Sequence, residues 1–224
     1  WMGAGNYHQG SQSEISLNSG EYSFVATGDY GRNFSLTSLV QSGNSLLASF
    51  TDAGTTVSAI FTFGAIGIND NLQRGEVSAT ISRTTNSNDT IAFYDVSDSS
   101  TGAIFYNGWS ILPGDPAYLK DSLELAKQSN LVIGASDLPS VGNSKIVALP
   151  NLAPDKAYGV LLLANSSADT IYSSYLPNGT KDKSHFMGLP LGDGSVAMGI
   201  ENTPILGSSD FSDWIVMLSS KATG

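Results

Sequence analysis

Apolar and polar residues alternate along much of the chain with the two-residue period of a half-buried β-strand. The alternation is clearest in residues 57–63 and 77–81, and clusters of Gly, Asn, Asp and Ser separate such runs. A first group of strands is predicted at residues 14–17, 22–27, 34–40, 46–51, 57–63 and 77–81. A second group is predicted at residues 91–96, 103–106, 145–149, 157–164, 170–174, 196–200 and 214–218. This spacing predicts an all-β fold that resembles a β-sandwich or jelly roll.

One segment departs from this period and predicts a short helix over residues 115–128. Asp115 can cap its first turn, Pro116 suits its first position, and Leu119, Leu123 and Ala126 fall on one face. The polar run at residues 84–90 is the best candidate for a boundary. We therefore expect a flexible arm at 1–12, an N-terminal β module at 13–86, and a C-terminal β module with the helix at 87–224.

The composition limits the classes of partner. Charged residues make up 13% of the chain, against about 25% in an ordinary soluble domain. The formal net charge is −10, which repels phosphate backbones, so we expect no nucleic-acid partner. No apolar run is long enough for a membrane span, and we expect no membrane insertion. The absence of cysteine excludes disulfides and thiolate chemistry, and it fits many bacterial surface proteins as well as a cytosolic protein.

The sequence contains few of the residues and motifs that catalytic sites require. The chain has two histidines, His8 and His185, and neither a Gly-x-Ser-x-Gly elbow nor a phosphate-binding glycine loop is present. A Ser–His–acid arrangement would have to use His185, and no pair of carboxylates stands out for glycoside cleavage. We therefore predict that the protein is not an enzyme, with a secreted hydrolase as the least favoured alternative.

Carboxylates near the C-terminus form a candidate calcium site. Glu201 and Asn202 follow one predicted strand, and Asp210 and Asp213 precede the next. Because the two strands are consecutive, these oxygens can converge with loop carbonyls, and calcium prefers such ligands. From spacing alone, the favoured interpretation is that the same acids cap turns and face solvent.

Six short segments, in order, resemble phrases of a known family. They are I-A-F-Y-D-V-S-D at 91–98, L-P-G-D-P-A-Y at 112–118, the strand at 157–165, K-S-H-F at 183–186, G-I-E-N at 199–202 and D-F-S-D at 210–213. The chain is similar over residues 88–219 to the uncharacterised β-domain family found in giant repeats-in-toxin adhesins and secreted cyanobacterial proteins. The resemblance implies a calcium site at Glu201, Asn202, Asp210 and Asp213, and a role in adhesion at a bacterial cell surface.

This sequence departs from the family pattern at several positions. Asn202 replaces an expected Asp, Ser212 replaces an expected Asn, Lys183 replaces the Asp before the histidine, and Ser209 stands where the family is often acidic or glycine. Fewer negative charges imply weaker calcium binding or a site that has been lost.

Two aromatic features suggest contact surfaces. Trp109 follows the turn-forming pair Asn107-Gly108 and can either form a platform for a sugar ring or cover the core. The uncharged arm carries Trp1, Met2 and Tyr7, which we predict to act in assembly by pairing with an edge strand of a neighbour. We therefore favour a calcium-stabilised, extracellular protein with a structural or adhesive function. It is expected to self-assemble into filaments or to form part of a larger adhesin. Its expected partners are other copies of itself or surface glycans. The alternative is a carbohydrate-binding β-sandwich.

Overall fold

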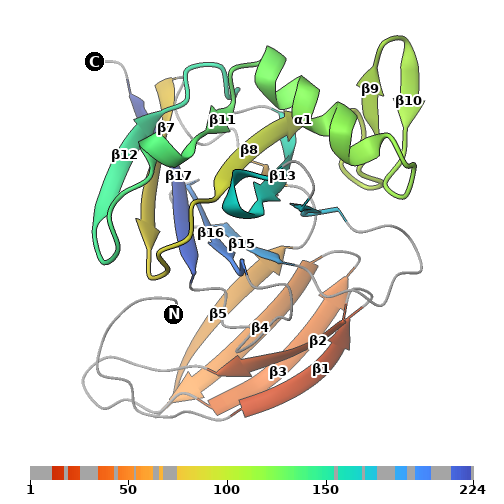
Figure 1. The fold of residues 1–224 in the computed structure, drawn as a ribbon. Helices are drawn as coiled ribbons and strands as arrows, with labels where there is room; N and C mark the ends of the chain where they lie inside the picture. The colour runs from red at the N-terminus through yellow and green to blue at the C-terminus, as the bar shows by residue number, and fades with distance from the viewer. Residues whose placement is uncertain are drawn as a thin grey trace.

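The computed structural model describes most of the chain and places it in antiparallel sheets (Figure 1). The described residues are 12–17, 20–25, 35–42, 45–52, 54–62, 66–67, 75–153, 156–167, 170–175, 185–190, 195–202 and 213–222. They are mostly β with one short α-helix, which confirms the predicted all-β, sandwich-like fold.

The largest sheet has eight strands in the order β12-β7-β17-β16-β15-β5-β4-β3. Its strands in chain order are β3 (Ser35–Ser42), β4 (Ser45–Asp52), β5 (Thr55–Thr62), β7 (Gly75–Arg83), β12 (Ser144–Ala148), β15 (Phe186–Pro190), β16 (Val196–Ile200) and β17 (Trp214–Ala222). All pairs are antiparallel, and β7 pairs with β17 along its whole length, from Gly75↔Ala222 to Arg83↔Trp214.

A second sheet of five strands has the order β11-β8-β13-β14, with β6 also paired to β13. Its strands are β6 (Ile66–Gly67), β8 (Thr90–Asp95), β11 (Val132–Ile133), β13 (Ala157–Leu163) and β14 (Ile171–Ser173). Two hairpins form sheets of their own: β1 (Gln12–Leu17) with β2 (Gly20–Val25), and β9 (Ile104–Tyr106) with β10 (Trp109–Ile111).

The two large sheets enclose the main hydrophobic core. From the five-stranded sheet, Ile91, Phe93, Val160 and Leu162 point into it. The eight-stranded sheet contributes every second residue of β7, β16 and β17: Val77, Ala79, Ile81, Val196, Met198, Ile200, Trp214, Val216 and Leu218. The apolar residues of the alternating pattern that predicts these strands are therefore the ones on the inner face of the sandwich.

The opposite face of the five-stranded sheet is covered by α1 (Tyr118–Gln128), which explains why β8 and β13 are buried continuously rather than alternately. Ala92, Tyr94, Leu161 and Leu163 meet Tyr118, Leu123 and Ala126 in a second core. The predicted apolar stripe of the helix was partly wrong. Leu119 is 37% exposed, and the buried face is instead made by Tyr118, Ser122, Leu123 and Ala126. The helix begins at Tyr118 rather than at residue 115, and its N-cap is Ala117 rather than Asp115.

Strand pairing crosses the predicted boundary at residues 84–90, because β7 before it pairs with β12 and β17 after it. The division into modules 13–86 and 87–224 stays a prediction. The predicted arm lies outside the described residues, with Trp1, Met2 and Tyr7, except that Gln12 begins β1. Among the described residues, no helix combines the length and hydrophobicity needed to cross a bilayer.

Candidate functional site

The structure brings together some of the predicted calcium ligands. The backbone N–H of Asn202 donates a hydrogen bond to Oδ2 of Asp213 at 2.9 Å, so these two residues are neighbours at the ends of β16 and β17. Glu201 is adjacent in the chain and buried. Asp210, Ser209, Ser212 and Lys183 lie outside the described residues. Within the described part of the chain, no three His, Cys, Asp or Glu side chains form a metal-binding group.

Asn202 takes part in a second contact that sequence reasoning missed. Its side-chain amide donates to Oδ2 of Asp89 at 3.0 Å and to Oγ of Ser87 at 2.7 Å. Asp89 is only 1% exposed, and its Oδ2 also accepts hydrogen bonds from Ser87 Oγ at 2.5 Å and Trp214 Nε1 at 2.9 Å. The same residues that were predicted to hold a cation thus border a buried carboxylate that is satisfied by N–H and O–H donors.

The remaining oxygen of Asp89 reaches the five-stranded sheet. Its Oδ1 accepts the backbone N–H of Asn165 at 2.8 Å, and Asn165 adopts the left-handed conformation with φ 52° and ψ 31°. Asp89 directly precedes β8, whereas Asn202 follows β16 and Trp214 begins β17. One carboxylate therefore joins both sheets at one end of the sandwich. This arrangement identifies Asp89 as a structural residue, because both of its carboxylate oxygens accept hydrogen bonds from other residues of the fold.

Calcium binding stays a prediction with a direct test. If Glu201, Asp210 and Asp213 hold a cation, a hundredfold excess of calcium over its dissociation constant adds about 2.7 kcal/mol to the free energy of unfolding. A chelator should then lower the melting temperature of the wild-type protein, and Asp210→Ala should abolish the difference. Identical melting curves with calcium and with chelator would contradict the prediction.

His185 is buried between the second sheet and the end of β16. Its Nδ1 lies 2.7 Å from the carbonyl oxygen of Glu201, so this nitrogen carries the proton, and its ring stacks on Tyr172 at a centroid distance of 3.7 Å. Only 7% of the residue is exposed. These contacts suit a packed histidine that links Phe186 of β15 to the end of β16, rather than a base open to substrate.

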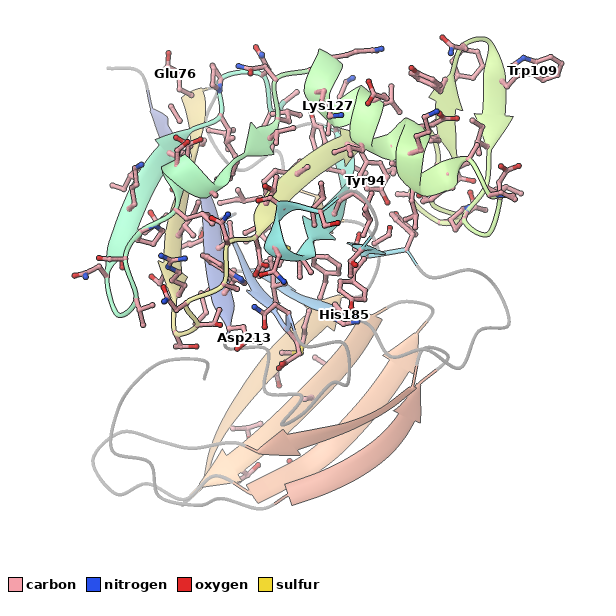
Figure 2. The ribbon with its side chains drawn as sticks, in the orientation of Figure 1. Glu76, Tyr94, Trp109, Lys127, His185 and Asp213 are labelled. Atoms are coloured by element: carbon pink, nitrogen blue, oxygen red, sulfur yellow. The ribbon has the colours of Figure 1, made fainter. Side chains whose placement is uncertain are left out.

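The hairpin β9–β10 presents two strongly exposed aromatic side chains. Trp109 is 74% exposed and Phe105 is 61% exposed. The turn between the strands is Asn107-Gly108, whose φ values are 51° and 86°, as in the two-residue turn that suits hairpins. Figure 2 shows Trp109 extending away from the body of the protein. The interpretation of Trp109 as a cover for the core is therefore wrong, because its ring faces solvent.

Pairing assigns the hairpin's aromatic residues to two faces. Trp109 pairs with Tyr106, and Ile111 pairs with Ile104, so these four side chains share one face. Phe105 pairs with Ser110 on the other. Ile104 is fully buried in the second core, and Ile111 packs against it. The base of the hairpin is thus anchored, while Tyr106 and Trp109 lie at its free end.

A group of buried tyrosines fixes the loop that leads into the hairpin. Tyr118 donates from its hydroxyl to the carbonyl oxygen of Gly102 at 2.6 Å, and Tyr175 donates to that of Ser99 at 2.7 Å. The Tyr94 hydroxyl lies 3.0 Å from that of Tyr118 and 2.9 Å from Ser173 Oγ. Burial raises the pKa of Tyr94 to about 12 and also raises the pKa values of Tyr118 and Tyr175. All three hydroxyl groups therefore stay protonated at physiological pH.

The loop itself is organised by Asp98. Its Oδ1 accepts the backbone N–H of Ser100 at 2.9 Å and the Ser100 hydroxyl at 2.7 Å, and its Oδ2 accepts the Thr101 hydroxyl at 2.9 Å. The Ser100 hydrogen bonds are the main reason that the pKa of Asp98 lies below its ordinary value. Together with the tyrosines, this turn holds the hairpin in one orientation relative to α1.

No family model, no curated protein and no solved structure matches this chain. The resemblance over residues 88–219 therefore remains an expectation from short motifs.

Proposed function

We propose that this protein is a non-enzymatic, extracellular binding module with a structural or adhesive role at a bacterial cell surface, and that it contacts its ligand through the β9–β10 hairpin. The observation that carries the proposal is the exposure of Trp109 at the end of a hairpin whose base is locked into the second core. Exposed, rigidly held tryptophans are the side chains that most often supply binding energy at contact surfaces.

The geometry favours recognition by stacking. Tyr106 and Trp109 are directly opposite each other on the same face of the hairpin, so their rings offer a short aromatic surface. Such a surface suits the apolar face of a sugar ring, while Asn107 is exposed in the adjacent turn and can bond to hydroxyl groups. This observation favours the carbohydrate-binding alternative as the way in which the module adheres.

The charge of the protein narrows the class of saccharide. With a formal net charge of −10, the protein repels sulfated and other acidic glycans at low ionic strength. Neutral saccharides carry no such penalty, so we assign a neutral surface glycan as the ligand.

The proposal of a binding function rather than catalysis is supported by the surroundings of His185. This histidine is buried and its ring is stacked on Tyr172, so little of the ring is open to a substrate.

Binding of an array of neutral glycans should depend on Trp109. Trp109→Ala should weaken binding at least about tenfold, because truncation of a hot-spot residue costs about 2 kcal/mol or more and about 1.4 kcal/mol is tenfold. Val40→Ala is the matched control, since Val40 is also exposed but belongs to β3, and it should bind like the wild type. A chelator should weaken glycan binding by the wild-type protein if the ligand site depends on calcium, and should leave it unchanged if the ligand stacks directly on Trp109. Equal binding by Trp109→Ala, or no binding to any glycan, would contradict the proposal.

A further inference from the structure

The two edges of the eight-stranded sheet differ in how they are protected. At one edge, β3 has a register shift between Leu36 and Ser38, and the Thr37 hydroxyl donates to the Ser49 carbonyl of its neighbour β4. Such irregularities hinder a further strand from pairing. At the other edge, β12 pairs with β7 in continuous register over all five residues, with no bulge. Among the described residues, no strand pairs with the outer side of β12.

The register shows which backbone groups of β12 point outward. Leu149 N–H donates to the carbonyl of Val77 at 2.8 Å, so residue 149 forms a hydrogen-bonded pair with residue 77. Because such pairs alternate in an antiparallel ladder, Lys145 and Val147 bond to β7. The backbone N–H and C=O groups of Ser144, Ile146 and Ala148 therefore face away from the sheet.

The side chains of β12 leave this edge open. Ile146 is 70% exposed, whereas Val147 on the opposite face packs against the main core. Lys145 is the one charged residue between positions 138 and 153, and its ammonium group donates to the carbonyl oxygen of Ser136 at 3.2 Å instead of extending along the edge. In a protein of net charge −10, this stretch contains no acid, so two copies can approach here with little mutual repulsion.

We propose that β12 is a self-association edge, at which two copies of this chain pair antiparallel about a twofold axis through Ile146. In this register Ile146 faces Ile146 of the second copy, Ser144 faces Ala148, and Lys145 faces Val147, so no like charges are opposed. The three outward-facing residues of each copy exchange backbone hydrogen bonds across the axis. The surface is independent of the hairpin, which lies on the other side of the molecule in Figure 1.

A strand of five residues spans about 17 Å, so the contact is small and the dimer weak. We expect a dissociation constant on the order of 0.1 mM. At a cell surface, where copies are concentrated, an association of this strength is sufficient to pair neighbouring molecules.

Single cysteines test the register, because the chain has none of its own. Ile146→Cys should form a disulfide-linked dimer under mild oxidation, since paired residues lie about 5.5 Å apart and a disulfide requires about 4.4–6.8 Å between Cα atoms. Ser144→Cys is the matched control. Two copies of residue 144 would be four positions apart, about 14 Å, and should stay unlinked. Equal cross-linking of both variants, or none with Ile146→Cys, would overturn the proposal.

Sedimentation equilibrium of the unmodified protein tests whether the dimer forms without a covalent link. The wild type should dimerise at concentrations near 0.1 mM, an order-of-magnitude expectation for so small an interface. Ile146→Pro should be monomeric yet folded, because the proline removes an N–H that faces outward and makes no bond to β7. Ile146→Lys places two like charges opposite each other in the dimer, so it should also be monomeric. It replaces the proline variant in this test if the proline variant melts early. A monomeric wild type at about ten times this concentration, or a dimeric Ile146→Lys, would show that β12 does not pair.

Discussion

Replacement of Asp89 by alanine should destabilise the protein more than removal of any other single carboxylate within the described residues. The substitution removes the acceptor of Trp214, whose contact is buried, and of Asn202 and Asn165, whose contacts are partly buried. A buried donor left unsatisfied costs about 1–3 kcal/mol, and the two partly buried donors add to this, so we expect a loss of about 3 kcal/mol in the free energy of unfolding. For a chain of this size that corresponds to a fall of about 6–12 °C in the melting temperature, measurable by calorimetry.

Asp98→Ala is the control for this experiment. Asp98 also accepts three hydrogen bonds, but it is exposed, so water can replace the lost acceptor. Its removal should change the melting temperature by only a few degrees, on the order of 1 kcal/mol or less. Asp89→Asn should fall between the two, because its amide oxygen can keep the donors at one position while its NH₂ group meets the N–H of Asn165. Similar melting temperatures for Asp89→Ala and the wild type would refute the structural role of this carboxylate.

The sequence predicted the strands of the sandwich well where burial is one-sided or complete. The strand at 196–200 is observed at Val196–Ile200, and that at 157–164 is observed at Ala157–Leu163. In β16 and β17 the apolar period follows directly from facing one core. β15 (Phe186–Pro190) was missed, because Gly188 and Pro190 are residue types depleted in strands, and pairing with β16 overrides that preference.

The hairpin could have been predicted more fully. Asn107-Gly108 between short apolar runs is a strong signal for a two-residue hairpin turn, yet only the strand at 103–106 was predicted and its partner β10 was not. The exposure of Trp109 could not be predicted, because Trp109 shares its face with the buried Ile104 and the core ends between these two positions.

Asp89 shows why buried polar residues escape a sequence pattern. It belongs to the polar run at 84–90, which has the composition of a surface linker. Its burial depends on Asn202 and Trp214, which lie 113 and 125 positions away in the chain. No local period encodes such a contact. The same reasoning applies to the predicted calcium ligands, whose separation in sequence allows convergence without requiring it.

An added methyl group at Gly159, in the second core, should lower the free energy of unfolding about as much as Asp89→Ala does. Gly159 of β13 pairs with Tyr94 of β8, and the tyrosine ring lies across the glycine. A Cβ atom at position 159 would lie 2.0 Å from Cζ of Tyr94. The ring cannot move aside easily, because it is fully buried and its hydroxyl is held by Tyr118 and Ser173.

Gly159→Ala should therefore lower the free energy of unfolding by about 3 kcal/mol, at the upper end of the usual cost of overpacking. Gly134→Ala is the matched control, since a Cβ there meets only a carboxylate oxygen of Asp137 at 4.0 Å and its φ is −79°. That substitution should be neutral or stabilise the protein by up to about 1 kcal/mol, because alanine has fewer unfolded conformations than glycine.

A double-mutant cycle assigns the cost of Gly159→Ala to the tyrosine ring. Tyr94→Leu is itself destabilising, because it removes the hydroxyl contacts to Tyr118 and Ser173, but it vacates the space that a Cβ at position 159 needs. The double variant should be more stable than the sum of the single changes by about 1–3 kcal/mol, the range seen for residues in direct contact. Strictly additive effects would show that the strain of Gly159→Ala arises elsewhere in β13. Because Tyr94 reaches the hairpin loop through Tyr118, Gly159→Ala should also weaken glycan binding in the fraction that remains folded, whereas Gly134→Ala should not.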